Sequence, residues 1–210
     1  MTQTTLSTAR LSLVQAAERL VAERGVHGVP ASAVVRAAGH KNNSAITYHF
    51  GSWEGLLEEV WRLHTDRVNV DRAVYLAAAH DRGAYDLPVM VEGYVGPLVA
   101  ELRRERPSYW ARFNEQWMAT IRLDIFALDD AALARQPQGG SVSVVHNLFT
   151  DMADALTHLP EADRTRRVAL MTRFVIGSLA AWEREPEAAP GLDELEPELV
   201  RLALALLEAS

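Results

Sequence analysis

Four polar side chains stand close together near residue 45, in a pattern suited to hydrogen bonding with DNA bases. Asn42, Asn43, Ser44 and Thr47 belong to one short stretch. An Asn amide can form two hydrogen bonds with an adenine edge, and Ser or Thr hydroxyls can bond several bases. Such contacts need a short helix that fits the major groove and is held there by neighbouring helices. The pattern alone leaves a recognition helix and an ordinary helical hairpin equally open.

The elements around this stretch have the layout of a helix-turn-helix unit. Apolar residues at helical spacing predict a helix over residues 8–24. Short helices are predicted over 30–39 and 44–48, and Ser52 opens a long fourth helix. The tight turn after the second helix contains Gly39, as helix-turn-helix turns often do.

The charges of the chain are unevenly distributed. The formal net charge is −7, yet residues 1–53 hold five basic and two acidic residues, a net +3. Residues 54–210 hold 16 basic and 26 acidic residues, a net −10. A positive end on an acidic body indicates an anionic partner at that end, although so few charges also fit a solvated surface.

The stretch from Ala38 to Leu57 resembles the signature of tetracycline-repressor-type (TetR) transcription regulators. In that family an Ala-Gly pair ends the second helix, and an aromatic run followed by Ser-Lys-Glu-x-Leu-Leu joins the third helix to the fourth. The matching residues here are Ala38-Gly39 and Tyr48-His49-Phe50-Gly51-Ser52-Trp53-Glu54-Gly55-Leu56-Leu57. The resemblance covers residues 9–57. It implies a helix-turn-helix DNA-binding domain over 1–56 and a helical effector-binding and dimerisation domain over 57–210.

The sequence departs from the family pattern at three points. Ten residues separate Gly39 from Phe50, one more than is common. Trp53 stands where the family has Lys, so an indole N–H replaces a charged phosphate donor. Pro30 stands where a capping Thr is common, which makes Ser32 the expected phosphate donor on the second helix.

Carried over position by position, the resemblance implies a set of DNA-contacting residues. Tyr48 and His49 could also be packed residues of the helix and its end. The implied set is Ser32, Lys41, Asn42, Asn43, Ser44, Thr47, Tyr48 and His49.

The rest of the chain reads as further helices separated by Gly- and Pro-rich breaks, with no convincing strand. The predicted fold is all-α with nine or ten helices, including helices from 87 to 105, from Pro107 onward, and near 142–157, 162–184 and 193–208. Aromatic and Met side chains concentrate in the middle helices, where core packing explains any single one of them. Rings at i, i+3 and i+7 of one helix also suit an apolar ligand site with a few polar groups. The predicted effector-binding residues are Trp61, Tyr94, Trp110, Phe113, Trp117, Ile121, Phe149 and Met152.

The segments 142–156 and 168–182 are predicted to form an antiparallel hairpin, because a short connection through Pro160 joins them. Small residues on the second helix would allow close approach of another helix. The family implies that two such hairpins pair between subunits, whereas the alternative is that the hairpin closes the core of one chain. The predicted interface residues are Val145, Ala169, Arg173, Gly177 and Ala181.

The sequence excludes several other classes of protein. Cysteine is absent, so disulfides and thiolate chemistry are excluded. No phosphate-binding Gly loop, nucleophile elbow or paired-histidine metal motif is present, so no cofactor or metal is expected. No segment suits a membrane span or a signal peptide, which favours the cytoplasm. We therefore expect a dimeric repressor that binds a palindromic operator and is released by a small apolar or aromatic effector. A helical protein–protein adaptor or a helical-bundle enzyme is the alternative.

Overall fold

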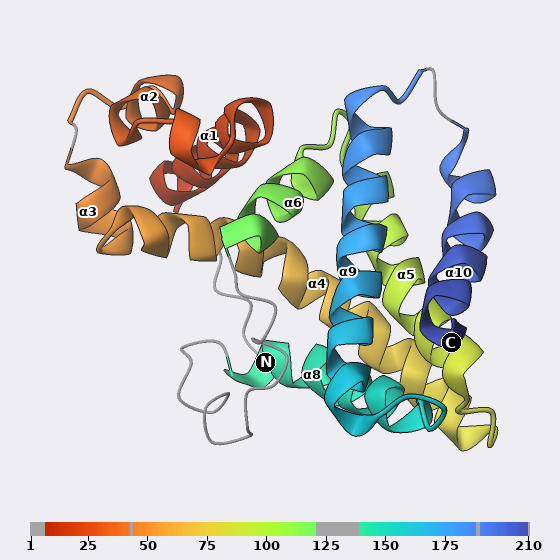
Figure 1. Cartoon of the computed structure of the whole chain (residues 1–210). Helices are drawn as coiled ribbons and strands as arrows, with labels where there is room; N and C mark the ends of the chain where they lie inside the picture. The colour runs from red at the N-terminus through yellow and green to blue at the C-terminus, as the bar shows by residue number, and fades with distance from the viewer. Residues whose placement is uncertain (1–6, 43, 121–138, 188–189, 210) are drawn as a thin grey trace.

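The computed structural model describes residues 7–42, 44–120, 139–187 and 190–209, and these residues form an all-helical protein (Figure 1). The described part contains nine α-helices, one short 3₁₀ helix and no strand, which confirms the predicted all-α class. The elements are α1 (Thr8–Arg24), η1 (Val26–Gly28), α2 (Ala31–Ala37), α3 (Ala45–Phe50), α4 (Trp53–Asp81), α5 (Leu87–Arg104), α6 (Trp110–Thr120), α8 (Gly139–Ala155), α9 (Glu161–Arg184) and α10 (Leu192–Glu208).

The first three helices form one end of the molecule, which we call the head (residues 8–50). Leu13 and Val21 of α1 are fully buried, and Val34 of α2 and Ile46 of α3 are buried with them. These side chains belong to a single apolar cluster that continues into α4. The head is therefore held together by the apolar face of α1, as its helical spacing predicts.

Helix α4 connects the head to the remaining helices, α5 to α10, which we call the body. Ser52 caps it by accepting a hydrogen bond from the Gly55 N–H at 3.0 Å. With 29 residues, α4 is about 44 Å long at the usual rise per residue. Figure 1 shows α4 starting beneath the head and running on through the body. One helix thus belongs to both parts.

Helix α5 packs closely on α4 around a proline. Pro97 has no N–H, so the carbonyl of Gly93 lacks its usual helical donor. The buried Arg72 of α4 replaces that donor, because its Nε donates to the Gly93 carbonyl at 3.2 Å and its Nη2 donates to the Tyr94 carbonyl at 3.4 Å. A Cβ on Gly93 would lie 2.5 Å from Leu76 Cδ2, so a larger residue at this position would require the Leu76 side chain to move.

The body helices pack around α9, which contacts α6, α8 and α10. Helix α6 begins at Trp110, so the predicted start at Pro107 is wrong by three residues. The reason is that a residue from another helix caps the N-terminal end of α6. The buried carboxylate of Glu183 on α9 accepts from the N–H groups of Ala111 at 3.2 Å and Arg112 at 2.9 Å.

Candidate nucleic-acid interface

The turn between α2 and α3 is fixed by backbone hydrogen bonds and by a contact with α1. The Gly39 N–H donates to the Arg36 carbonyl and the His40 N–H donates to the Val35 carbonyl, both at 3.0 Å. Gly39 has φ 78°, a left-handed conformation that favours glycine at a helix end. His40 Nε2 lies 3.2 Å from Ser12 Oγ of α1. The start of α3 is thereby set relative to α1.

Helix α3 turns one side to the core and the other to solvent. Ala45 and Ile46 are buried, whereas Thr47 and Tyr48 are exposed, Tyr48 by 83%. The exposed side of α3 therefore presents two of the predicted DNA-contacting residues to solvent.

The other predicted DNA-contacting residues lie next to this exposed side or at its edge. Those described are Lys41, Asn42 and Ser44, which are exposed, and Ser32 and His49, which are half-buried. Asn42 Oδ1 accepts hydrogen bonds from the Ser44 N–H at 3.0 Å and the Ser44 hydroxyl at 2.7 Å, so the two polar residues order each other before the helix. The predicted contact Asn43 lies outside the described residues.

Arg10 fastens α3 to the rest of the head, a role that the sequence did not reveal. Its Nη1 donates to the His49 carbonyl at 2.6 Å, and its guanidinium lies 4.7 Å from the centre of the Phe50 ring. Its Nη2 lies 3.4 Å from Glu59 Oε1 on α4. These partners are about forty or more positions from Arg10 along the chain, so no spacing rule connects them.

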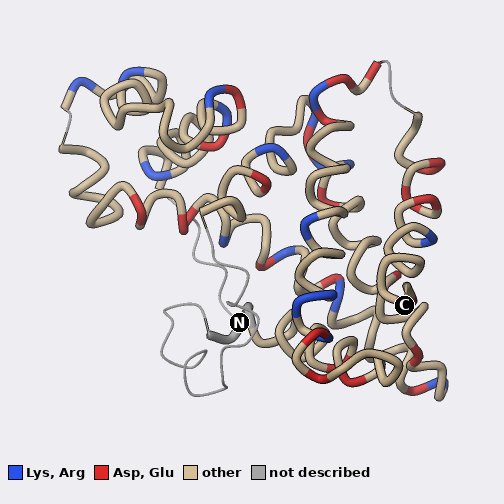
Figure 2. The backbone as a smooth tube through the Cα atoms, in the orientation of Figure 1, with Lys and Arg blue, Asp and Glu red and all other residues tan. Residues whose placement is uncertain are grey.

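We call α2, the turn after it and the exposed side of α3 the recognition side of the head. The charged residues on this side are basic. Residues 25–53 contain Arg36 and Lys41 and no Asp or Glu. Both basic side chains are exposed. Figure 2 shows basic colour on α2 and the adjoining turn, whereas the acidic colour gathers along α4 and the body. A surface of this kind suits a phosphate backbone, which dominates DNA affinity through charge.

The predicted effector-binding residues lie inside the body and form two separate ring groups. Tyr94, Trp110, Phe113, Phe149 and Met152 are buried, and Trp61 and Trp117 are half-buried against the same core. Trp110 stacks on Phe113 with ring centres 6.3 Å apart, and Tyr94 contacts Phe149 at 5.4 Å. Ile121 lies outside the described residues. The predicted residues that the structure describes therefore belong to one core, but they do not line a single cavity.

Two hollows adjoin these ring groups. A cavity of about 10 Å³ between α5, α6 and α9 is lined by Trp110 and Asn114 among apolar side chains. The buried Asn114 Oδ1 has no hydrogen-bond partner among the described residues. A larger cavity of about 190 Å³ lies between α8 and α9 and is lined by Phe149, Asp154 and Arg164, among others.

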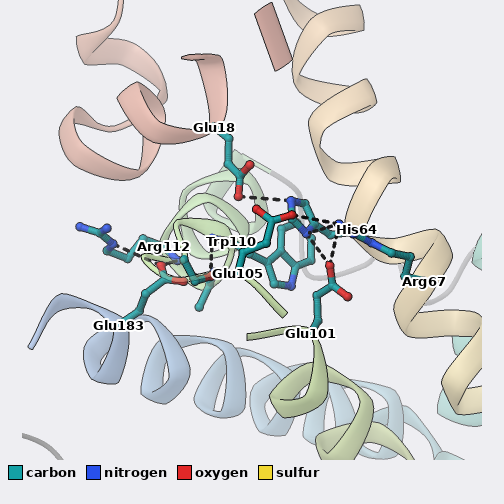
Figure 3. A network of polar contacts seen from close by, with 10 residues as sticks. Glu18, His64, Arg67, Glu101, Glu105, Trp110, Arg112 and Glu183 are labelled. Atoms are coloured by element: carbon teal, nitrogen blue, oxygen red, sulfur yellow. Dashed lines mark hydrogen bonds and ion pairs between the residues drawn. The ribbon is translucent and has the colours of Figure 1, made fainter. Parts of the chain in front are cut away.

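A buried polar cluster joins the head to the body, and we call Glu18, His64, Arg67 and Glu101 the junction cluster (Figure 3). His64 Nδ1 lies 2.7 Å from Glu101 Oε1 of α5 and bonds to it. His64 Nε2 lies 3.2 Å from Glu18 Oε1 of α1, an ion pair without regular hydrogen-bond alignment. Arg67 Nη2 lies 2.8 Å from Glu101 Oε1. Charges from α1, α4 and α5 therefore meet away from water.

The junction cluster keeps the His64 imidazole protonated. Burial by itself lowers the pKa of His64, but the bond to Glu101, the close contact with Glu18 and the charges of these two carboxylates outweigh burial and raise the pKa to about 9. The one signal in the sequence is that His64 recurs at helical spacing with the apolar residues Leu57, Val60 and Val68. Nothing in the sequence paired it with Glu18 or Glu101.

The predicted dimer-interface residues have different environments. Ala169 is fully buried within the chain, and Val145 is half-buried against its core. Arg173 Nη1 donates to the Met118 carbonyl at 3.1 Å, and Gly177 is half-buried. Ala181 is exposed. The large apolar side chains that are exposed on the last two helices are Leu170 on α9 and Leu202 and Leu206 on α10.

Comparison with known proteins agrees with this arrangement. The sequence profile of the bacterial regulatory proteins of the tetR family matches residues 13–60. The fold is similar to that of a TetR-family transcriptional regulator from Rhodococcus sp., with a TM-score of 0.53 and 18% identity over 96% of this chain and 100% of that chain. A transcriptional regulator from Rhodococcus sp. Rha1 gives a TM-score of 0.51 and 18% identity over 95% of this chain and 96% of that chain. No curated protein matches the sequence.

These findings show that residues 13–60 match the helix-turn-helix DNA-binding domain of the tetR family, and that the fold of the chain is similar to that of TetR-family transcriptional regulators. Proteins of this family are DNA-binding regulators and not enzymes. In the part of the chain that the structure describes, no helix has both the length and the apolar character needed to cross a membrane.

Proposed function

We propose that this regulator is a homodimeric repressor that binds a palindromic operator and is released by a small apolar or aromatic effector. In this proposal residues 1–56 bind DNA, and residues 57–210 bind the effector and the second subunit. The observation that carries it is the exposed side of α3, with Thr47 and Tyr48 in solvent beside a turn that has exposed Lys41 and no carboxylate.

We assign contacts with DNA bases to one group of residues and contacts with DNA phosphates to another. The polar residues at the start of α3, Asn42, Asn43, Ser44, Thr47 and Tyr48, face base edges in the major groove and select sequence. Ser32, Lys41 and His49 contact phosphates and set the position of the helix. Base contacts are specific because donors and acceptors differ between base pairs, whereas phosphate contacts are the same everywhere.

Selection from random duplexes followed by titration tests DNA binding directly. We expect the full-length protein to enrich a near-palindromic site and to bind it at least about a thousandfold more tightly than random duplex. The control is the same duplex with both half-sites scrambled. Equal affinity for the selected, scrambled and random duplexes would contradict the proposal.

The dimer is proposed because one short recognition helix makes too few contacts for useful specificity. Leu170, Leu202 and Leu206 support α9 and α10 as the surface that meets the second copy. Arg167 Nη1 donates to the Leu206 carbonyl at 2.9 Å, which holds the end of α10 beside the early part of α9. Figure 1 shows these two helices side by side on one flank of the body. Exposed leucines on adjacent helices are typical of a surface that is covered in an oligomer.

Light scattering tests this surface. Leu170→Glu introduces a charge into the proposed interface and should convert dimer to monomer at micromolar concentration. The control is Val74→Glu, since Val74 is an exposed apolar residue of α4 far from α9 and α10 along the chain. A monomeric mass for the unmodified protein, or an unchanged dimer in Leu170→Glu, would contradict the proposed interface.

The effector is proposed to bind in the ring-lined core of the body. Apolar walls with a few polar groups are what a small-molecule site requires. The Trp110 cavity has such walls and the unpartnered Asn114 oxygen, but its volume of about 10 Å³ holds no more than one water, so the proposal requires α5, α6 and α9 to separate when the effector binds. Quenching of intrinsic tryptophan fluorescence provides a screen for ligands, and each ligand found is then added to the operator titration. Ligands that quench but leave operator affinity unchanged would contradict effector control. Expression from the native promoter with and without the regulator gene tests repression.

A further inference from the structure

His64 lies where charged side chains from three helices meet between the head and the body. It lies on α4, yet its ring contacts Glu18 of the head and Glu101 of the body. These side chains are buried, with 6% exposure for Glu18, 3% for His64 and 4% for Glu101. The Trp110 ring of α6 covers the imidazole, with ring centres 4.7 Å apart and planes 16° from parallel. Figure 3 shows His64 between Glu18 and Glu101, with Trp110 beside it.

Two carboxylates, one near each ring nitrogen, favour the doubly protonated imidazole and oppose the charge of Arg67, whose Nη2 lies 3.2 Å from His64 Nδ1. A neutral imidazole carries one N–H and one lone pair, so one nitrogen would turn a lone pair toward a carboxylate. Both ring nitrogens here lie close to carboxylate oxygens. The charged groups that face the ring are Glu18 from α1, Glu101 from α5 and Arg67 from α4, while α6 contributes the uncharged Trp110.

The carboxylate on the body side of His64 has further cationic partners, whereas the carboxylate on the head side does not. Glu101 is also held by Arg67, and by Arg104, whose Nε lies 3.0 Å from Glu101 Oε2. Arg67 lies 4.0 Å from Glu105 as well. Glu18, in contrast, has His64 as its only ion-pair partner among the described residues. Loss of the His64 charge would therefore leave the head's buried carboxylate uncompensated, which is costly.

We infer that His64 is a positioning residue for DNA binding, whose charge holds α1 of the head to α5 of the body and so sets the angle at which α3 meets DNA. This inference rests on the proposed operator binding. Two recognition helices of a dimer must reach half-sites at a fixed spacing, so the angle of each head affects affinity without any contact to DNA. Helix α1 carries both the Glu18 side of this contact and the Arg10 and Ser12 contacts that orient α3 and its turn.

The dependence on pH gives a readout that simple packing would not change. If operator binding requires the His64–Glu18 contact, the bound protein holds the proton more tightly than a protein whose head has moved away. Operator affinity then falls as the pH rises above the pKa of the displaced imidazole, and the fall is complete once the pH passes the raised pKa of about 9. Because the group is stabilised in its protonated form, the contact is complete below pH 6.5 and is lost as the pH passes about 9.

The experiment compares two single substitutions on α1 in the full-length protein. Glu18→Gln removes the head's charge from His64 but keeps an acceptor oxygen of the same size. Glu23→Gln is the matched control, because Glu23 is exposed on the same helix and its substitution removes the same charge. Affinity for the selected operator is measured by fluorescence anisotropy from about pH 7.5 to about pH 9.5, and folding is checked by circular dichroism.

We expect Glu18→Gln to bind the operator about tenfold more weakly at pH 7.5 and to lose most of the fall in affinity with pH, whereas Glu23→Gln behaves like the unmodified protein. The inference is overturned if Glu18→Gln keeps both the affinity and the pH dependence of the unmodified protein. Should Glu18→Gln fail to fold, His64→Gln is subjected to the same comparison with the same criteria. Failure of the unmodified protein to bind any duplex would instead overturn the proposed function, so the two failures are distinguishable.

Discussion

The recognition side of the head and the junction cluster use polar residues in opposite ways. On the recognition side, Lys41, Asn42 and Thr47 are in solvent, and Asn42 accepts hydrogen bonds from the nearby Ser44. In the junction cluster, Glu18 and His64 are buried and come from separate helices. The first arrangement leaves donors and acceptors available to a partner, whereas the second consumes them within the fold. On the proposed function, the recognition side supplies sequence specificity and the junction cluster supplies the orientation of the head.

The energetic reason for this difference is the cost of removing charge from water. A solvated side chain such as Lys41 bears little of that cost until it binds. A buried carboxylate such as Glu18 bears it permanently and is tolerated only beside a partner. Substitutions should therefore change DNA binding without stability on the recognition side, and change stability or orientation at the junction and behind it.

The largest expected effect is the loss of Trp110, which packs against both His64 and Phe113. Trp110→Ala removes a buried ring and leaves a cavity, so the free energy of unfolding should fall by about 3–5 kcal/mol. Urea denaturation measures it. Tyr48→Ala serves as the contrasting variant and should leave stability within about 0.5 kcal/mol while weakening DNA binding. Similar losses of stability in both variants would remove the distinction between the two regions.

The next effect concerns Arg72, which supplies the donor that Pro97 cannot. Arg72→Met should lower the free energy of unfolding by about 1–3 kcal/mol, because the Gly93 carbonyl is left buried without a donor. Pro97→Ala restores a backbone N–H, so Arg72→Met should cost less in the Pro97→Ala background. A double-mutant cycle measures this coupling. Strictly additive effects would show that the arginine does not substitute for the missing helical bond.

On the recognition side, Thr47→Ala should weaken binding to the selected operator by about 1–3 kcal/mol at particular base positions. Thermal unfolding should be unchanged, because the Thr47 side chain is exposed. Titration of operators with single base changes identifies the positions concerned. Equal weakening on every sequence would assign Thr47 to the phosphates instead.

The smallest effect is expected at Lys41. Lys41→Ala should weaken binding on all duplexes alike and reduce the slope of log affinity against log salt by about 1. Arg82→Ala is the control, since Arg82 is an exposed cation at the C-terminal end of α4, the opposite end of that helix from the head. A slope that is unchanged in Lys41→Ala, or reduced equally in both variants, would contradict a direct phosphate contact.

Much of the fold could be predicted because its signals are local. The helical spacing of apolar residues in 8–24, the cap at Ser52 and the turn at Gly39 each depend on residues within a few positions. The exposed side of α3 follows equally from Ala45 and Ile46 facing the core. The start of α6 was misplaced because its cap, Glu183, is supplied by another helix.

The candidate effector core was predictable in composition but not in arrangement. Bulky rings at helical spacing indicate a buried face, and Trp110 and Phe113 are indeed buried. That Trp110 stacks on His64, while Tyr94 instead contacts Phe149, depends on how α4, α5, α6 and α8 pack against one another.

The sequence by itself determined the all-α class, the helix-turn-helix unit and the polar residues of its recognition side, because helix formation and capping are set by near neighbours. Only the tertiary structure decided which of the many carboxylates are buried and what they hold. Glu18 and Glu23 are both glutamates of α1, yet one faces His64 in the core and the other faces solvent. The physical reason is that the free energy of a charge depends on the solvent it loses and the partners it gains, and both come from residues far away in the chain.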